Sequence, residues 1–313
     1  MSQLDHFSFA CPNCQAPLVA SGKTVLRCPS EGVSYPEVDG IWRFLTGERQ
    51  EYFHQFMQEY QAVRQAEGRD SLDPSYCRAL PFKDLTGMRQ HDWDIRATSY
   101  RTLLDRVIQP TEAIRGHPLK ILDIGAGNGW LSYRLAQRGH HVAAIDLLTN
   151  SGDGLGAYLH YDACFLPVQA DFNRLPFTPF QMDLVIYNAS FHYATSYHTT
   201  LLEGLRVLGD HGCLVVMDTP VYSDPKSGAQ MVLERESQFK QRYGFPSNAI
   251  PSENYLTYAR LQELSAELGL RWQLITPFYG FRWMLRPWLA RLRGSREPAR
   301  FSLITGLRQN SML

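Results

Sequence analysis

Hydrophobic positions between residues 119 and 146 change from a continuous run to a helical spacing and then back to a continuous run. The first run, 119–124, is short and nearly uninterrupted, which is typical of a parallel strand covered on both faces. Leu131 and Leu135 follow one helical turn apart, and a second run, 141–145, comes after them with Asp146 at its end. This stretch therefore predicts a β-strand, an α-helix and a second parallel β-strand.

The same alternation of apolar runs and helical periods continues over the rest of the chain. Further strands are predicted at 167–172, at 180–190 with the loop that follows, and at 212–217, 271–276 and 301–307. Helices are predicted at 48–66, 91–108, 130–138, 199–208, 230–243 and 255–268. This alternation predicts an α/β fold with a doubly wound, mainly parallel sheet.

Two of these helices carry specific end signals. Pro110 is expected to end the helix at 91–108, because the residue before a proline disfavours the helical conformation. Ser252 is expected to cap the helix at 255–268 through its hydroxyl group.

The composition is that of an ordinary soluble globular protein, with 44% hydrophobic and 20% charged residues among 313. Lys+Arg and Asp+Glu each total 31, and this balance argues weakly against RNA as the main partner. Neither a secretory leader nor an apolar stretch long enough to span a membrane is recognisable. The six cysteines do not have the spacing of a disulfide scaffold. We therefore expect a cytoplasmic protein with one large domain and an appendage.

A glycine-rich turn joins the first predicted strand to its helix, with Gly125, Gly127 and Gly129 at alternate positions. Such glycines allow the backbone to approach a ligand closely. A dinucleotide fold would have Gly-x-Gly-x-x-Gly, whereas here the third glycine comes one residue early and Asp123 lies in the strand. A carboxylate at that point favours an ammonium or sulfonium group over a pyrophosphate. Asp146, at the end of the second strand, is an acceptor suited to a ribose diol.

The run 123–129 followed by Asp146 resembles the first motif and the next acidic residue of class I S-adenosylmethionine-dependent methyltransferases. The resemblance implies a seven-stranded Rossmann-like sheet in which strand seven is antiparallel. It also implies S-adenosylmethionine as the cofactor. The residues expected to bind it are Asp123, Gly125, Gly127 and Gly129 at the methionine end, Asp146 at the ribose, Asp171 and Phe172 at the adenine, and Ala126, Asn128, Leu147, Asn188 and Ala189 as further contacts.

The loop after the fourth strand of this family lines the methyl-transfer cleft, which places the chemistry at 188–193. His192 is the best candidate for a catalytic base, since imidazole titrates near neutral pH. Many methyltransferases act mainly by orientation, so a positioning or packing histidine is an equal alternative. The helix at 48–66 is expected to pack on the main domain or to act as a lid whose Tyr60, Arg64 and Glu67 reach into the cleft.

The N-terminal segment has the spacing of a zinc ribbon. Cys11 and Cys14 form a Cys-x-x-Cys knuckle, and Cys28 returns a third thiolate. The expected fourth position is Glu31, and His6 is another candidate ligand. The segment is therefore either a zinc site with one oxygen or imidazole ligand, or a degenerate ribbon without metal.

The segment 35–41, with the motif Tyr-Pro-x-x-Asp-Gly-Ile, resembles the end of the small zinc-ribbon activator subunit of tRNA and protein methyltransferases. A similar ribbon precedes the catalytic domain of ribosomal RNA guanine methyltransferases. The domain organisation expected from these resemblances is a zinc-ribbon-like domain at 1–46, a helical linker and cap at 47–118, and a cofactor-binding domain at 119–313 with cap insertions at about 221–255 and 278–299.

The methyl acceptor is less constrained than the cofactor. Balanced charge and aromatic cap regions favour a small or medium-sized metabolite, methylated on oxygen or nitrogen. The ribbon favours an alternative, ribosomal or transfer RNA, and a non-catalytic cofactor-binding protein that docks through its ribbon is a third hypothesis. The segment 278–293, which mixes aromatic residues with arginines, fits an aromatic cap over the substrate, a peripheral membrane contact or an RNA-contacting surface.

Overall fold

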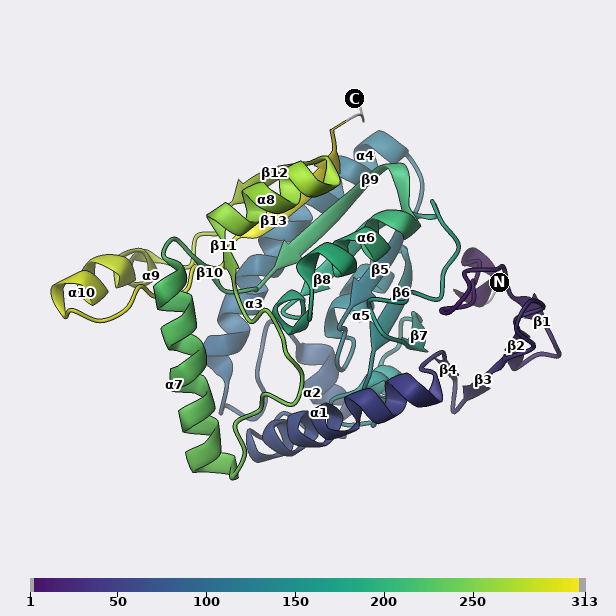
Figure 1. Ribbon diagram of the computed structural model, residues 1–313, viewed down its shortest axis with the longest axis horizontal. Helices are drawn as coiled ribbons and strands as arrows, with labels where there is room; N and C mark the ends of the chain where they lie inside the picture. Colours follow the sequence, from purple (N-terminus) through teal and green to yellow (C-terminus); the bar gives the residue numbers. More distant parts are fainter. Residues whose placement is uncertain (1–2, 310–313) are drawn as a thin grey trace.

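The computed structural model describes residues 3–309, and within this range eleven strands form one mixed sheet with the order β1-β2-β3-β4-β7-β6-β5-β8-β9-β13-β12 (Figure 1). The strands are β1 (Val19–Ala20), β2 (Val25–Arg27), β3 (Ser34–Val38), β4 (Ile41–Arg43), β5 (Lys120–Ile124), β6 (His141–Asp146), β7 (Leu166–Gln169), β8 (Met182–Asn188), β9 (Leu208–Met217), β12 (Leu270–Ile275) and β13 (Leu303–Arg308). Strands β4 to β9 pair in parallel, whereas β13 is antiparallel to both β9 and β12. The doubly wound sheet and its antiparallel last strand are therefore confirmed.

Helices cover both faces of this sheet. In Figure 1, α6 and α8 lie in front of the strands, whereas α3, α4 and α5 lie behind them. Buried apolar residues accordingly form two clusters, one shared with α6 and α8 and one shared with α2, α3 and α5. The helices are α1 (Gly47–Ala66), α2 (Pro74–Ala79), α3 (Gln90–Leu103), α4 (Gln109–Arg115), α5 (Trp130–Gln137), α6 (Tyr197–Val207), α7 (Pro225–Tyr243), α8 (Tyr258–Leu268), α9 (Phe281–Met284) and α10 (Arg286–Leu292), with the shorter turns η1 (Gln3–His6), η2 (Leu104–Ile108), η3 (Leu155–His160) and η4 (Phe191–Tyr193).

The prediction of a seven-stranded sheet was wrong in its strand number, because the N-terminal segment 3–46, here called the ribbon, adds β1 to β4 to the sheet. Strand β4 pairs in parallel with β7, with Trp42 opposite Val168. Phe9 of the ribbon stacks on Phe44 and on Phe177, each at 5.2 Å between ring centroids. The ribbon thus covers an edge strand that would otherwise present unpaired backbone groups, and it shares one hydrophobic core with the sheet.

The expectation that the helix at 91–108 ends before Pro110 was also wrong. Helix α3 passes through the π-helical turn η2 into α4, which ends at Gly116 in a left-handed conformation. Pro110 lies in the first turn of α4, a position at which proline is tolerated. The π turn separates this first turn from α3, and the chain therefore stays helical.

Helix α8 begins later than expected, and Thr257 rather than Ser252 caps it. The Thr257 hydroxyl accepts a hydrogen bond from the Arg260 amide at 3.0 Å. The preceding residues form the short strand β11 (Leu256–Thr257), which pairs with β10 (Val221–Tyr222) and fixes where the helix begins. Ser252 instead donates a hydrogen bond to the carbonyl of Tyr193, in the loop after β8.

The connection between β6 and β7 is a glycine-containing loop followed by the short turn η3, and α1 lies alongside it. Arg64 of α1 forms a buried ion pair with Asp153 of this loop. Figure 1 shows α1 along the lower edge of the molecule. Among residues 3–309, no helix combines the length and the apolar character that a membrane span requires.

Candidate functional site

A pocket lies where β5, β6 and β8 end. This is the edge at which open α/β sheets bind ligands. Strand ends and loops supply most of its wall, and α1 supplies the remainder. The lining residues are Phe56, Tyr60, Gly125, Ile145, Asp146, Leu147, Leu148, Ala170, Phe172, Ala189, Ser190 and Tyr193.

The glycine turn is shaped by close packing as well as by its backbone angles. Gly125 has a φ of +71°, and a Cβ atom added there would lie 2.2 Å from the Cβ atom of Ser190. The amides of Gly125 and Ala126 both donate to the carbonyl of Ile145, at 2.8 and 2.9 Å. Gly129 is equally constrained, since a Cβ atom there would lie 2.5 Å from the ring of Phe165. The turn is therefore held against β6 and β8 in one conformation.

Asp146 presents its carboxylate to the pocket from the end of β6. One oxygen accepts from the amide of Gly127 at 2.8 Å, and the other accepts from the amide of Leu148 at 2.9 Å. Burial raises the pKa of Asp146, while these backbone hydrogen bonds act in the opposite direction. Each carboxylate oxygen keeps a further acceptor site, so a diol in the pocket can be bound.

Asp123 lies at the end of β5 but is fully buried and does not line the pocket. Its Oδ2 atom accepts from the Ser132 hydroxyl at 2.7 Å, whereas its Oδ1 atom has no hydrogen-bond partner among the described residues. Burial raises the pKa of Asp123 to about 7, and the charge of Asp146 acts in the same direction. A buried oxygen without a partner favours a proton or a nearby cation.

Asp171 lies just after β7, but both of its oxygens already have partners. Arg49 of α1 donates to Oδ2 at 2.6 Å, and the amide of Asn173 donates to Oδ1 at 2.9 Å. The neighbouring Phe172 lines the pocket, as does Ala170. In this structure the Asp171 carboxylate therefore anchors α1, and the ring beside it faces the pocket.

Helix α1 covers the pocket with aromatic side chains. Phe56 and Tyr60 each pack edge-on against Tyr193, at 5.7 and 5.8 Å between centroids. The structure thus brings Tyr60 to the pocket, as the lid hypothesis requires. Glu67 does not reach it and instead pairs with Arg69 at 2.8 Å and with Arg89 at 3.1 Å.

A second cavity adjoins the first and shares Phe56 and Tyr193 as a common wall. Helix α7 and the loop 247–254 supply the rest of its lining. Arg235 of α7 donates to the Asn254 side chain at 2.7 Å, while its Nε atom is buried without a partner among the described residues. This cavity therefore holds a guanidinium group with unused hydrogen-bonding capacity, and the carboxylate of Glu236 also lines it.

His192 lies in η4, beside Tyr193 but outside the lining of both cavities. Its Nδ1 atom is buried and has no partner within residues 3–309. Burial lowers the pKa of His192 to about 3, and the positive charges of Arg235 and Arg96 add to this effect. The imidazole is therefore neutral at pH 7 and has little tendency to take up a proton.

The remaining predicted contacts divide between the pocket and the layer behind it. Leu147 and Ala189 line the pocket, and Ala189 has a φ of +53°. Asn188, by contrast, is buried with its Oδ1 atom unpartnered in the described part of the chain. Ala126 and Asn128 belong to the glycine turn and do not line the pocket.

Sequence reasoning did not assign Phe56, Ile145 or Leu148 to the pocket, although the structure places them in its wall. Ile145 and Leu148 flank Asp146, so their position at a strand end was an available signal. Phe56 is one of several apolar and aromatic residues at helical spacing in the helix predicted at 48–66, and such spacing does not distinguish a core face from a pocket face.

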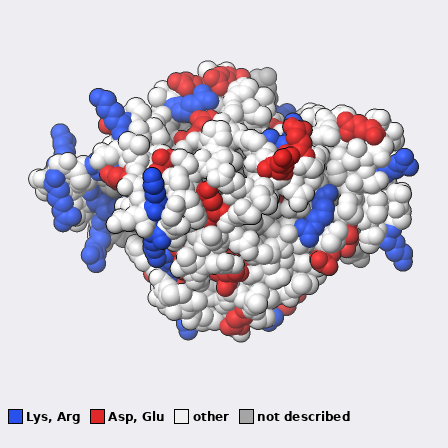
Figure 2. Space-filling view, turned by 60° about the horizontal axis from the view of Figure 1, so that its bottom comes forward, with Lys and Arg blue, Asp and Glu red and all other residues white. Residues whose placement is uncertain are grey.

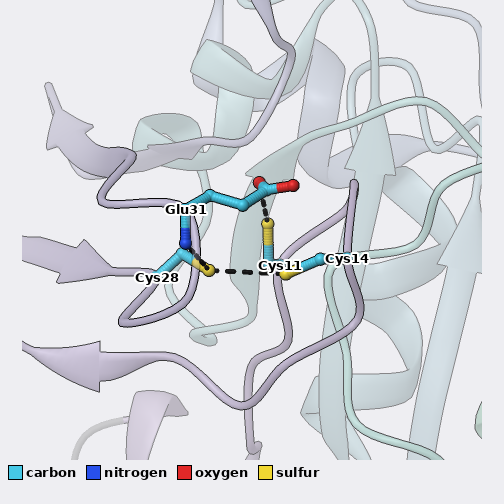
Figure 3. Close-up of side chains that lie close together, drawn as sticks. All are labelled: Cys11, Cys14, Cys28 and Glu31. Carbon is cyan, nitrogen blue, oxygen red and sulfur yellow. Dashed lines mark hydrogen bonds between the residues drawn. The ribbon is translucent and has the colours of Figure 1, made fainter.

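The predicted metal ligands come together in the ribbon (Figure 3). One ligand atom from each of Cys11, Cys14, Cys28 and Glu31 lies within 4.8 Å of all the others. The Sγ atoms of Cys14 and Cys28 are 3.5 Å apart, close to the roughly 3.8 Å that a tetrahedral zinc site imposes between sulfur ligands. The donor set therefore suits zinc. His6 is not part of the cluster, since its ring stacks on His141.

Residues 122–216 match a family whose description is "Methyltransferase domain". The chain carries a methyltransferase domain. Its first motif and sheet are those of the class I, S-adenosylmethionine-dependent methyltransferases, and S-adenosylmethionine is the cofactor of this domain. The predicted cofactor is confirmed, whereas the residues assigned to it remain predictions.

Known proteins share this methyltransferase domain. Over 127 residues the chain is 31% identical to malonyl-[acyl-carrier protein] O-methyltransferase of Geobacter sulfurreducens, covering 39% of this chain and 46% of the relative. The enzyme with the same name from Halorhodospira halophila is 30% identical over 128 residues, covering 39% and 42%. The chain thus spans less than half the length of these relatives. The structure of geranyl diphosphate C-methyltransferase from Streptomyces coelicolor is also similar, with a TM-score of 0.46 and 14% identity over 73% of this chain and 89% of that one.

Proposed function

We propose that the chain transfers a methyl group from S-adenosylmethionine to an oxygen of a small or medium-sized metabolite, and that this metabolite is an acid. The observation that carries the proposal is the pair of cavities that share Phe56 and Tyr193 as a common wall. One cavity lies at the strand ends where the cofactor of this fold binds, and the other holds an arginine with an unpartnered Nε atom. A donor and an acceptor molecule could therefore meet at the shared wall.

The cofactor supplies a methyl group made electrophilic by its sulfonium charge. In the first pocket, Asp146 would accept from the ribose hydroxyls, and Phe172 would cover the adenine ring. Asp123 would act from behind the glycine turn. Its pKa is raised because its carboxylate is buried without a nearby cation, so the positive charge of the cofactor would stabilise its ionised form. Asp171 would contribute indirectly, because it holds Arg49 and thereby α1 in place.

Two arginines act on the acceptor side, where Glu236 also lines the cavity. Arg235 and Arg96 both lower the pKa of His192 and also act on Tyr193, so their charges converge on the loop after β8. Neither arginine forms an ion pair with a residue in 3–309, although Asp218 is near enough to act on Arg96. An acid acceptor would supply the missing negative charge. The name of the curated relatives, O-methyltransferase, agrees with oxygen as the nucleophile.

A carboxylate needs no general base, because it is already deprotonated at neutral pH. The work of the protein is then to orient the acceptor, exclude water and hold the reacting groups in line. Phe56, Tyr60 and Tyr193 would exclude water at the shared wall. We assign His192 a positioning role, as a neutral acceptor of a hydrogen bond, because a pKa of about 3 suits it poorly to remove a proton.

We further propose that the ribbon binds one zinc ion through Cys11, Cys14, Cys28 and Glu31. When bound, the ion would stabilise the ribbon, which carries no described residue of either cavity. Metal analysis of the purified full chain should find one zinc per molecule, and Cys28→Ser should remove it. Cys164→Ser, which changes an exposed cysteine outside the cluster, should retain it. Metal-free wild-type protein, purified without chelators, would establish an empty ribbon.

The acceptor class can be tested by incubating the protein with methyl-labelled S-adenosylmethionine and a fractionated cell extract. We expect label in the small-molecule fraction, and we expect mild alkali to release it as methanol, because carboxylate methyl esters hydrolyse in base. Alkali-stable label in that fraction would show that the methylated atom is a nitrogen or a hydroxyl oxygen and not a carboxylate oxygen. Label in RNA would contradict a metabolite acceptor, and cofactor binding without transfer to any fraction would contradict catalysis.

A further inference from the structure

Residues 278–293 form an arm that projects from the body of the molecule at the left end of Figure 1. Its two short helices, α9 and α10, follow each other through Leu285, which itself has helical angles. Neither helix contains a buried residue. The arm therefore contributes little to the hydrophobic core, although its sequence is rich in large apolar side chains.

These apolar side chains form a single exposed face, here called the apolar stripe. Its spacing of three and one residues follows the helical repeat across both helices. The side chains of Phe281, Trp288 and Leu292 are 76%, 73% and 80% exposed. The stripe consists of Phe281, Met284, Leu285, Trp288, Leu289 and Leu292. A continuous apolar face of this kind indicates an interaction surface.

Arginines flank the apolar stripe without any acidic neighbour on the arm. The sequence has no Asp or Glu between residues 277 and 296. Arg282, Arg286, Arg291 and Arg293 form no ion pair with any residue of the described chain. Figure 2 shows Lys and Arg side chains gathered at the left end of the molecule, where Figure 1 places the arm, whereas both charge signs mix over the rest of that face.

The base of the arm is fixed to the body, and this holds the apolar stripe outward. Tyr279 shares a hydrogen bond of 2.9 Å with Ser99 of α3. Trp283 packs against Tyr279 at 5.0 Å and against Phe301 at 5.8 Å. Arg286 stacks on Trp283, with its guanidinium 3.8 Å from the ring centroid. Orientation of the stripe is therefore set before any partner binds.

We propose that the arm binds the surface of a membrane that contains anionic lipids. The apolar stripe would enter the acyl boundary, and the arginines would contact lipid phosphates, as in amphipathic helices that lie in the membrane interface. A second copy of the chain is less compatible with this surface, since it would bring two sets of unpaired arginines together. A nucleic acid would leave the apolar stripe in water. The proposal does not depend on the acceptor proposed above.

Vesicle flotation of the full chain tests this proposal without any activity measurement. Vesicles of phosphatidylcholine with phosphatidylglycerol should carry the protein upward, and binding should weaken at high salt. The triple variant Phe281→Ser, Trp288→Ser and Leu292→Ser should bind at least about 1,000-fold more weakly, since each large apolar side chain contributes about tenfold or more. Ile114→Ser is the matched control, because Ile114 is 74% exposed and lies on α4, away from the arm.

Replacing the arginines separates charge from burial. Arg282→Gln with Arg291→Gln should weaken binding to the anionic vesicles by roughly 25-fold, or about fivefold per arginine. Binding to vesicles of phosphatidylcholine alone should not change. Wild-type protein that stays with the soluble fraction, or a triple variant that floats like the wild type, would overturn the proposal. A doubled mass in solution that the triple variant abolishes would assign the stripe to a second copy of the chain.

Discussion

The two sides of the cleft present different charged side chains. On the acidic side, beneath α1, the carboxylate of Asp146 lines the pocket, while Asp123 is buried behind it and Asp153 is paired with Arg64. On the cationic side, beneath α7, Arg235 lines the second cavity beside Glu236, and Arg96 acts on the same loop. The acidic side is built from strand ends, which any sheet of this class provides. The cationic side is built from α3 and α7, which the fold leaves free to vary. The difference indicates that the sheet selects the cofactor and the inserted elements select the acceptor.

The arginines of the two sides also differ in their partners. Arg49 and Arg64 of α1 pair with the buried carboxylates of Asp171 and Asp153 on the acidic side. Arg235 contacts only a neutral amide among the described residues. An arginine of the acidic side therefore neutralises a charge of the protein itself, whereas Arg235 retains its capacity for a charge that comes from outside.

The largest expected effect is on stability and would test this contrast directly. Arg64→Ala leaves Asp153 buried without its partner, which should lower the free energy of unfolding by about 3 kcal/mol. Arg235→Ala should lower it by less than about 1 kcal/mol, because no carboxylate loses its partner. Urea unfolding of both variants beside the wild type gives the two values. Equal losses of unfolding free energy in the two variants would contradict the claim that only Arg64 neutralises a buried charge of the protein.

The next effect concerns the cofactor alone. Gly125→Ala would place a Cβ atom 2.2 Å from that of Ser190 and should weaken S-adenosylmethionine binding by about 100-fold, since the turn must move. Gly116→Ala is a matched control with a φ of +67° and no atom within 4 Å of the added Cβ. Calorimetric titration of both variants separates the close contact from backbone strain. A similar affinity in the two variants would exclude the close contact as the cause.

A smaller effect should appear on the acceptor side only. Arg235→Gln should raise the KM for the acid acceptor by about tenfold or more, because one charge-assisted hydrogen bond is lost. The Kd for S-adenosylmethionine should remain at its wild-type value. Arg242→Gln, an exposed change on the same helix, should alter neither constant. Steady-state kinetics would contradict the assignment if Arg235→Gln changed the cofactor constant instead.

The smallest effect is a pH dependence of stability. The pKa of Asp123 is raised to about 7 in the folded chain, so the folded state holds this proton more tightly than the unfolded state does. The stabilisation is complete below about pH 4 and is lost as the pH rises through about 7. Between pH 5 and pH 8 the melting temperature should therefore fall less in Asp123→Asn than in the wild type. If the melting temperatures of the two proteins changed equally with pH, a group other than Asp123 would be responsible for the pH dependence.

The acidic side was largely predictable from sequence because its residues are adjacent to the ends of apolar runs. Asp146 follows the run 141–145, and the parallel pairing of β5 with β6 brings it beside the glycine turn. Hydrogen bonding was less predictable. Asp171 was expected at the adenine, and nothing local to it indicated that Arg49, which lies 122 positions away in the chain, would occupy one of its oxygens.

The cationic side could not be predicted in the same way. Arg96 and Arg235 lie far apart in the sequence, and each lies on a helix whose apolar spacing gives no information about a cavity. The position of the ribbon in the fold could not be predicted from the sequence either. Its cysteines were recognisable by spacing, but the pairing of β4 with β7 depends on a sheet edge that forms only after folding.

Titration of S-adenosylmethionine into the wild-type chain, Asp146→Asn and Arg235→Gln by calorimetry tests the division of the cleft most directly. We expect one site per chain in the wild type, binding at least tenfold weaker in Asp146→Asn, and wild-type affinity in Arg235→Gln. Absence of binding in the wild type, or a loss in Arg235→Gln that equals the loss in Asp146→Asn, would contradict the account.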